Sequence, residues 1–440
     1  LSLYFGNSNT EIIKKLNYSK VITLKIQSIR GTRDILPEQI QQWHYAYDIL
    51  KSTSEKFGFE EYRTPIFEKT EVFKRSIGDE TDIVNKEIYT FLDKGGESIT
   101  LRPEMTAAIV RSVIQNNLLA LQNILRIWYF GPFFRYERPQ KGRLRQFHQY
   151  GAELIGSPNP EADAEIIDLA ISLINAFGLK DYKLLINSLG NSQSRQNYRQ
   201  ALVDYFQSNI EKLNNESIQR LQVNPLRILD SKDPYEQELI INAPSILEYL
   251  DQESKEHFDT VLGLLDSSNI EYEISPQLVR GLDYYSHTVF ELRSNLLGSQ
   301  DSFAGGGRYD ELFSQMGDKP TPAVGFAMGI ERLLLILEQC NLFPEFPSKI
   351  DFYIVFQDKN YLSYARRVAH LLRENGYNVV IELAGRSFKA QMREANKLQS
   401  HYAVLIGEEE FDNSSVSVKD MKTSQQIVIA LDKLQDTFKK

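Results

Sequence analysis

The chain has 440 residues, of which 42% are hydrophobic and 25% are charged, and its formal net charge is −9 at pH 7. This length predicts about two to four domains, and the composition excludes a largely disordered chain. The apolar runs are shorter than the roughly 20 residues that a bilayer-spanning helix needs, and the single cysteine, Cys340, excludes an internal disulfide and a cysteine-based metal cluster.

Residues 1–25 are interpreted as an unassigned N-terminal extension. Their apolar block, Leu1–Phe5, is too short for a secretory signal. Four lysines against one acid, Glu11, leave an organelle-import segment open, although the absence of arginine argues against it. We therefore expect a cytoplasmic protein with no membrane partner.

A polar, glycine-bearing segment, Arg30-Gly-Thr-Arg-Asp34, precedes a predicted helix over residues 38–57. The following elements are a proline-edged strand over 58–66, short strands at 88–92 and 98–101, and a helix that opens at Pro103 and continues through Val113. At the start of this helix lie Glu104 and Thr106. Taken alone, they favour a plain N-terminal cap over a ligand site.

A loop rich in arginine joins two predicted strands. The aromatic run 128–130 leads into the loop, and the apolar run 150–155 leads out of it. Five basic side chains lie between Arg135 and Arg145. Because guanidinium groups bind phosphate oxygens in a bidentate way, the loop predicts a phosphate-bearing partner.

The second half of this domain starts with a strand at 183–189 and a span of helical spacing over about 190–268, interpreted as an inserted helical module. Strands resume at 272–274, at 289–292 and around Phe303. A turn at Gly305–Gly307 and a helix-like run over 327–337 close the domain. Two prolines, Pro344 and Pro347, indicate a linker.

Strands and helices alternate after the linker, which predicts a small α/β domain with a largely parallel sheet over 349–440. This part carries 14 lysines and arginines against 12 acids, a net +2, so the rest of the chain carries −11. The negative total argues against a nucleic-acid binder, but an acidic body can still bind RNA through local basic loops.

Two further clusters are ambiguous when taken singly. Residues 278–288 combine Arg280 with the paired tyrosines Tyr284 and Tyr285, which suits a polar ligand but also a strand edge with surface tyrosines. The glycine-rich stretches near residues 305 and 325 are weak signals, since neither is a P-loop.

Three arginines from separate segments carry the functional hypothesis. We expect Arg135, Arg280 and Arg332 to converge on one face, where three guanidinium groups suit a polyphosphate undergoing substitution. The sequence contains no convincing metal-ligand cluster, so we expect no protein-bound metal, and Mg²⁺ would arrive with the nucleotide.

Five segments resemble those of the class II aminoacyl-tRNA synthetases, and in detail the bacterial-type histidyl-tRNA synthetases. The resemblance covers about residues 26–440, and the run from Arg280 to Tyr285 is its most specific part. The segments are Arg30–Asp34, Leu101–Thr106, Gly131–Gln149, Leu278–Tyr285 and Ala323–Arg332.

The resemblance implies an α+β fold. Its catalytic domain, over 26–345, would hold an antiparallel six-stranded sheet flanked by helices, with the helical insertion at about 190–268. Residues 349–440 would form an α/β anticodon-binding domain. Pro65 lies in a segment similar to the class's first motif, which implies a homodimer through the region around Pro65.

The implied activity is that of a histidine–tRNA ligase. ATP, carrying Mg²⁺, and L-histidine would form histidyl-adenylate and pyrophosphate, and the histidyl group would pass to the 3′ end of tRNA(His). Imidazole offers one donor and one acceptor, which Glu153 and Tyr285 would pair. A ligand without these groups would leave buried polar atoms unpaired, which can discriminate by about 10⁴-fold.

The resemblance also assigns residues by position. Arg135 would hold the α-phosphate, Arg332 the γ-phosphate, and Arg280 both the α-phosphate and the histidine carboxylate; these three are the implied catalytic residues. The implied histidine-binding residues are Glu104, Met105, Thr106, Gln149, Glu153, Tyr284, Tyr285 and Tyr309. ATP would be bound by Arg135, Glu137, Arg143 and Arg332, the tRNA acceptor end by Arg138 and Gln140, and the anticodon region by Arg386 and Lys389.

Two alternative hypotheses belong to different functional classes. One is a non-catalytic paralogue such as the synthetase-like regulatory subunit of ATP phosphoribosyltransferase, against which the three arginines and the C-terminal domain argue. The other is a class II synthetase or related ligase for another amino acid, against which the Arg280–Tyr285 motif and Glu153 argue.

Overall fold

The computed structural model describes residues 26–77, 87–140, 142–229, 231, 233–280, 284–298 and 301–438. The N-terminal extension, residues 1–25, and the motif positions 281–283 lie outside the described residues. The chain divides into two compact units, Leu1–Phe343 and Pro344–Lys440, which are described separately below.

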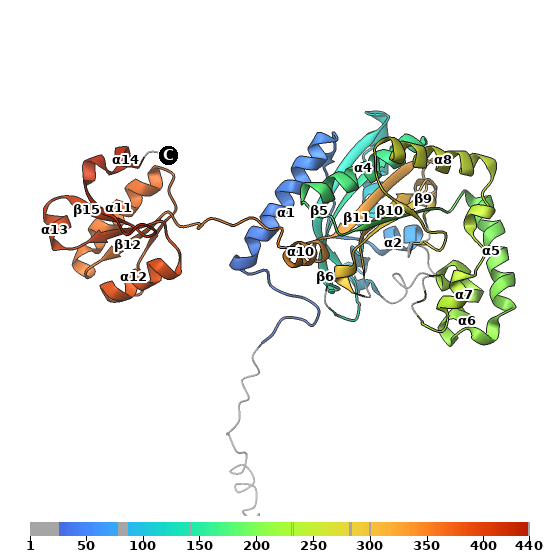
Figure 1. Ribbon diagram of the computed structural model, residues 1–440, viewed down its shortest axis with the longest axis horizontal. Coiled ribbons are helices and arrows are strands. Elements are labelled where there is room, and N and C mark those ends of the chain that lie inside the picture. The colour runs from blue at the N-terminus through green and yellow to red at the C-terminus, as the bar shows by residue number, and fades with distance from the viewer. Residues whose placement is uncertain are drawn as a thin grey trace, which may run out of the picture. The chain divides into compact units, whose positions relative to one another are not determined.

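An eight-stranded sheet forms the centre of the first unit, in the order β1-β5-β6-β11-β10-β9-β7-β8 (Figure 1). Its six inner strands are antiparallel, which confirms the expected catalytic sheet, and the two-residue edge strands pair in parallel. The strands are β1 (Glu60–Glu61), β5 (Leu125–Phe134), β6 (Gln146–Ile155), β7 (Lys183–Ser188), β8 (Glu273–Ile274), β9 (Ser286–Arg293), β10 (Ser302–Arg308) and β11 (Ala323–Gly329). The strand predicted over 58–66 is therefore too long.

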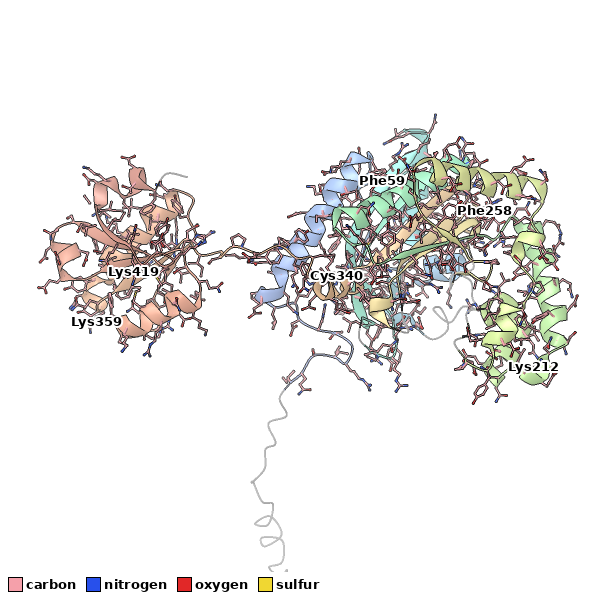
Figure 2. The ribbon with its side chains drawn as sticks, viewed as in Figure 1. Phe59, Lys212, Phe258, Cys340, Lys359 and Lys419 are labelled. Atoms are coloured by element: carbon pink, nitrogen blue, oxygen red, sulfur yellow. The ribbon has the colours of Figure 1, made fainter. Side chains whose placement is uncertain are left out.

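Successive side chains along each strand point to opposite faces of the sheet. On β6, Tyr150, Ala152 and Leu154 face a core shared with helices, while Gly151 and Glu153 point to the other face. Phe59 and Phe258, labelled in Figure 2, are buried in that core. The helices that contribute to it are α1 (Pro37–Lys56), α4 (Pro160–Ala176), α8 (Gln252–Ser267) and α10 (Ile330–Gln339).

Two predictions around the glycine-rich segments are wrong. Gly305–Gly307 lie inside β10, not in a turn, and residues 327–329 end β11 before α10 begins at Ile330. Glycine occurs inside a strand where another group approaches the backbone closely. A Cβ on Gly305 would lie 2.6 Å from Nη1 of Arg280, and one on Gly306 would lie 2.0 Å from a backbone oxygen.

The remaining elements of the first unit form a small sheet and a helical segment. The small sheet has the order β2-β4-β3. The inserted module is helical as predicted, and side chains of Asn191, Asn214 and Asp251 cap three of its helices. The segment includes Lys212 (Figure 2). These elements are β2 (Phe67–Lys69), α2 (Thr70–Ile77), β3 (Tyr89–Leu92), β4 (Ser98–Leu101), α3 (Thr106–Gln115), α5 (Ser192–Gln207), α6 (Asn215–Val223), α7 (Gln237–Ile241) and α9 (Leu312–Gln315).

The second unit contains a five-stranded sheet in the order β13-β12-β14-β15-β16. Only β13, β12 and β14 are parallel, and β15 and β16 add antiparallel strands, so the prediction of a largely parallel sheet is correct for about half of it. Its elements are β12 (Phe352–Phe356), α11 (Leu362–Glu374), β13 (Val379–Ile381), α12 (Phe388–Lys397), β14 (Tyr402–Ile406), α13 (Glu408–Asp412), β15 (Ser415–Asp420), β16 (Gln426–Ala430) and α14 (Leu434–Thr437).

None of the helices in the described part of the chain combines the length and apolarity that a bilayer crossing requires.

Candidate active site

Two neighbouring pockets lie in the first unit, and Arg135 and Gln149 line both. The acid pocket, about 200 Å³, is lined by Glu104, Thr106, Tyr129, Arg135, Gln149, Glu153, Arg280, Tyr284, Tyr285, Gly305, Tyr309, Gly325, Phe326 and Ala327. The arginine pocket, about 250 Å³, is lined by Arg135, Glu137, Gly142, Arg143, Leu144, Phe147, Gln149, Gly329, Glu331 and Arg332.

Glu153 is the central charged group of the acid pocket. It lies on β6 and is buried, and its two oxygens accept hydrogen bonds from the Thr106 hydroxyl at 2.8 Å and the Tyr309 hydroxyl at 2.7 Å. Burial raises the pKa of Glu153 to about 8, although both hydroxyl groups act in the opposite direction. The pocket wall thus favours the protonated form of this carboxyl far more than water does.

Glu104 serves the helix and the pocket together. Its carboxylate accepts hydrogen bonds from the backbone N–H groups of Thr106 at 2.6 Å and Ala107 at 3.0 Å, at the start of α3. Burial raises its pKa, and these N–H groups oppose the rise. The cap interpretation is thus confirmed, and the same carboxyl lines the acid pocket.

Met105 lies outside this arrangement. Its side chain is buried in the core, and its sulfur accepts hydrogen bonds from the Thr64 hydroxyl at 3.3 Å and from Arg102 at 3.4 Å. Among the predicted histidine-binding residues, all of them described, it alone does not line the acid pocket. The cause is the α3 start, where neighbouring side chains point in different directions.

The expected convergence of three arginines is found, with Arg135 as the shared member. Arg280 lines the acid pocket and Arg332 the arginine pocket. Nη1 of Arg280 donates to Glu291 at 2.6 Å, and Nε of Arg135 donates to the Pro103 carbonyl at 2.9 Å. Both guanidinium groups are therefore anchored at the pocket walls.

These arginines lie close enough for their positive charges to act on one another, in addition to their acidic neighbours. Burial lowers the pKa of Arg135, and the charge of Arg280 lowers it further. Burial also lowers the pKa of Arg332, with further lowering from Arg143 and Arg135. The two pockets thus bring together several guanidinium groups whose positive charges repel one another, an arrangement that suits a polyanion.

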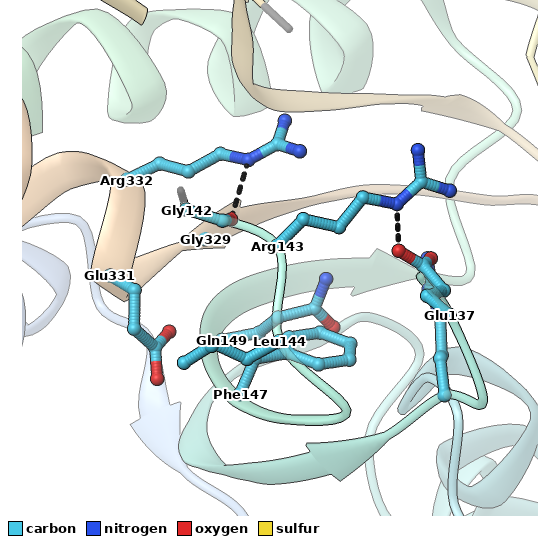
Figure 3. Close-up of a pocket in the computed structure, with 10 residues that line it drawn as sticks. Glu137, Gly142, Arg143, Leu144, Phe147, Gln149, Gly329, Glu331 and Arg332 are labelled. Atoms are coloured by element: carbon cyan, nitrogen blue, oxygen red, sulfur yellow. Dashed lines mark hydrogen bonds and ion pairs between the residues drawn. The ribbon is translucent and has the colours of Figure 1, made fainter. Parts of the chain in front are cut away.

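The arginine pocket contains both anchored and apolar groups. Nε of Arg332 donates to the Gly142 carbonyl at 3.1 Å, and Arg143 pairs with Glu137. Figure 3 shows Arg143 and Arg332 directing their guanidinium groups to the same side of the pocket. The Phe147 ring lies beneath Arg135, 5.3 Å from the guanidinium carbon, and so supplies an apolar surface beside the charges.

The predicted RNA-binding residues are not among those that line the two pockets. Arg138 and Gln140 are exposed on the loop, where Gln140 pairs with the Arg143 backbone. In the second unit, Lys389 is exposed, but Arg386 forms ion pairs with Glu382 and Glu394. The structure therefore presents Lys389 more freely than Arg386.

Sequence reasoning did not assign three residues near the site. Tyr129 lines the acid pocket from β5, Phe147 lines the arginine pocket, and Glu291 binds Arg280. The signal for Tyr129 was its place in the aromatic run, where strand alternation points it away from Trp128. The sequence gave no comparable signal for Glu291, because only the pairing register of β9 with β10 places it opposite Gly305.

In the described ranges, no three His, Cys, Asp or Glu side chains come together as a metal site would require.

Comparison with known proteins identifies the chain. The sequence profile of histidyl-tRNA synthetase matches residues 31–333, and that of an anticodon-binding domain matches residues 351–440. The chain belongs to the histidyl-tRNA synthetase family. It is therefore an aminoacyl-tRNA synthetase with a catalytic and an anticodon-binding domain.

Relatives of this synthetase extend over nearly its whole length. The histidine–tRNA ligase of Crocosphaera subtropica is 48% identical over 401 residues, 91% of this chain and 92% of the relative. That of Chlorobaculum parvum is 46% identical over 411 residues, 93% and 96% of the two chains. The structure of the S. aureus histidyl-tRNA synthetase has a TM-score of 0.79 at 38% identity, covering 94% of this chain and 100% of the other.

A buried ion pair in this synthetase fixes the chain next to Tyr309. Arg308 and Asp163 are both fully buried, and Nε of Arg308 donates to Asp163 at 3.1 Å. Burial alone would raise the pKa of Asp163, but Arg308 and His257 bring it down to about 2. Arg308 also donates to the carbonyls of Ser157 and Asn159, so the end of β10 is held to α4 and the segment before it.

Asp163→Asn is expected to lower the free energy of unfolding by about 3–5 kcal/mol, because it leaves the Arg308 charge buried beside a neutral partner. Urea denaturation at pH 7 measures this value. Glu311→Gln is the matched control, since Glu311 forms a partly exposed ion pair with Arg195 and should cost at most about 1 kcal/mol. Equal effects of the two substitutions would contradict the prediction.

Proposed function

We propose that this chain is a histidine–tRNA ligase. A histidine carboxylate oxygen attacks the α-phosphorus of ATP, the bond to pyrophosphate breaks, and histidyl-adenylate forms. A hydroxyl at the 3′ end of tRNA(His) then attacks the acyl carbon, and AMP leaves. One observation carries the proposal: in a chain of this family, the pocket around Glu153 lies next to a pocket lined by arginines, and Arg135, Arg280 and Arg332 line the two.

The arginines are proposed to bind and stabilise the phosphates. Arg135 is placed to contact the α-phosphate, since it lines both pockets, and Arg332 to contact the γ-phosphate. Arg280 would contact the α-phosphate and the histidine carboxylate as charge develops there. Glu137 and Arg143 complete the ATP site, and Mg²⁺ enters as part of the ATP substrate.

The acid pocket is proposed to bind histidine. Glu104, Thr106 and Gln149 would bind the α-amino group, and Glu153 and Tyr285 the imidazole nitrogens; all five line this pocket. Tyr284 and Tyr309 form the walls, with ring centroids 5.8 Å apart. Imidazole can form a further hydrogen bond with the buried carboxyl, which apolar side chains cannot, and this favours histidine over apolar amino acids of similar size.

We propose that the tRNA contacts both units. Arg138 and Gln140 are exposed beside the arginine pocket, which suits contact with the acceptor end. Lys389 and Arg386 lie at the start of α12 in the anticodon-binding domain, and the pairing of Arg386 with two acids suggests a positioning role there. We further propose that the enzyme acts in the cytoplasm, where ATP, histidine and tRNA are available together.

A homodimer through the region around Pro65 is also proposed. Pro65 is exposed, and the neighbouring small sheet exposes four large apolar side chains, a surface of the kind that marks a protein interface. These side chains are Ile66, Phe67, Phe91 and Leu92.

Phe67→Asp is expected to convert this dimer to a monomer, because it places a charge in the apolar interface. Sedimentation equilibrium should give about twice the 50.8 kDa chain mass for the unmodified protein and the single chain mass for the variant. Tyr235→Asp is the control, since Tyr235 is exposed on the helical segment. A monomeric unmodified protein, or a dimeric Phe67→Asp variant, would contradict this interface.

The proposed function is tested by amino-acid-dependent exchange of pyrophosphate into ATP. Exchange that requires histidine, followed by histidyl transfer to tRNA(His), is the expected result. A folded protein that activates no amino acid would instead support the regulatory paralogue. Preference for another amino acid would support a ligase of different specificity.

A further inference from the structure

Gly325 lies directly opposite Glu153 in the sheet, on the neighbouring strand β11. The Glu153 side chain folds back across β11, so that a Cβ on Gly325 would lie 1.6 Å from Oε2 and 2.5 Å from the carboxyl carbon. This is the shortest such distance among the glycines of the described residues. The carboxyl of Glu153 thus occupies the space that a side chain at position 325 would need.

Backbone conformation does not explain this glycine. Gly325 has no left-handed φ, so an alanine could adopt its backbone conformation. Glycine weakens a strand interior, where most residues contribute packing. The same arrangement recurs beside it, since Tyr129 lies opposite Gly151, and a Cβ there would be 2.2 Å from the Tyr129 hydroxyl oxygen. Both glycines make room for a side chain of the acid pocket.

A Cβ at position 325 would act first on the Glu153 carboxyl. A carboxyl is the movable end of a side chain, but Thr106 and Tyr309 hold this one by hydrogen bonds to its two oxygens. Displacing it breaks those bonds and pushes the carboxyl into a cavity of about 200 Å³. The backbone carbonyl of Ala152 lies 2.7 Å from the same Cβ position, so strand β6 would also have to shift.

We propose that Gly325 is a specificity-determining residue of the histidine pocket, because its missing side chain lets the Glu153 carboxyl lie across β11 where it pairs with imidazole. This inference rests on the proposed function. It assigns histidine selection to a pair of residues in register on adjacent strands. Gly325 acts through Glu153 and so is a positioning residue.

The test compares Gly325→Ala, Glu153→Asp and the double variant by histidine-dependent pyrophosphate exchange. Gly325→Ala should lower kcat/KM for histidine by at least about 100-fold while KM for ATP stays within about 3-fold. Aspartate withdraws the carboxyl by about one C–C bond, roughly 1.5 Å, so the clash distance grows to roughly 3 Å. The double variant should therefore match Glu153→Asp and exceed Gly325→Ala by about 10-fold.

If a second substitution at Glu153 restores exchange activity, the defect of Gly325→Ala arises from displacement of the Glu153 carboxyl and not from general damage to the strand. Gly263→Ala is the matched control, since a Cβ there meets nothing within 4 Å. A double variant no more active than Gly325→Ala, or a Gly325→Ala variant within about 5-fold of the unmodified enzyme, would overturn the proposal. If Gly325→Ala alone does not fold, kcat/KM for histidine is compared between the double variant and Glu153→Asp. A value for the double variant more than about 5-fold below that of Glu153→Asp would overturn the proposal. An unmodified enzyme without histidine-dependent exchange would refute the proposed function itself.

Discussion

Arg280→Ala is expected to lower histidine-dependent pyrophosphate exchange by about 10²–10³-fold while the affinity for ATP changes little. Arg280 lines the acid pocket, whereas the arginine pocket proposed for the outer phosphates is lined by Arg135, Arg143 and Arg332. The remaining arginines can therefore still bind the nucleotide. The contact that is lost acts on charge that develops at the α-phosphate during the reaction, and such contacts affect the rate more than binding.

The measurement pairs exchange kinetics with the Kd for ATP from calorimetry. Arg293→Ala is the matched control, because Arg293 donates to the second oxygen of Glu291, at 2.8 Å, but does not line either pocket. It tests whether loss of a Glu291 partner alone explains the defect. If ATP affinity fell as much as the exchange rate, Arg280 would be a binding residue and its proposed role in catalysis would be wrong.

The elements that carry periodic apolar side chains could be predicted from the sequence. The amphipathic spacing after Pro37 predicted α1, and the aromatic and apolar runs predicted β5 and β6. The arginine-rich loop between those strands predicted a phosphate-bearing partner, because guanidinium groups bind phosphate oxygens in a bidentate way, and Arg135 and Arg143 of this loop line the arginine pocket. The convergence of Arg135, Arg280 and Arg332 was expected because three guanidinium groups from separate segments suit a polyphosphate, and spacing along the chain could not establish it.

Other features depend on contacts between distant segments and could not be predicted. Gly305 suggested a turn and Gly325 gave only a weak signal, yet each lies in a strand where a side chain from elsewhere crosses it. Glu382 and Glu394 lie only four and eight residues from Arg386, but the sequence alone does not show that both pair with it in the folded domain. The strand β15 was not predicted, because its serines interrupt the apolar pattern and become buried only through pairing.

Glu153→Gln is expected to stabilise the empty enzyme at alkaline pH and to reduce activation of histidine by at least about 100-fold. The folded protein holds the Glu153 proton up to a pKa of about 8, whereas an unfolded glutamate loses it near 4.5. A raised folded pKa means that the stabilising contribution is fully present below pH 4.5 and is lost as the pH rises toward 8. Glutamine does not ionise, so the variant escapes this loss.

The difference in unfolding free energy between Glu153→Gln and the unmodified enzyme should therefore shift in favour of the variant by roughly 3–5 kcal/mol between pH 4.5 and pH 8. Urea denaturation across this range measures the shift, and all other titrating groups cancel in the difference. Glu338→Gln, at an exposed position of α10, is the control, because it removes a carboxyl that is not buried and shows how the unfolding free energy changes with pH in that case. A pH-independent difference would show that Glu153 is ionised in the empty pocket. The expected result means that the folded enzyme keeps a buried carboxyl whose ionisation destabilises it, at the position proposed to pair with imidazole, as is common for groups of functional sites.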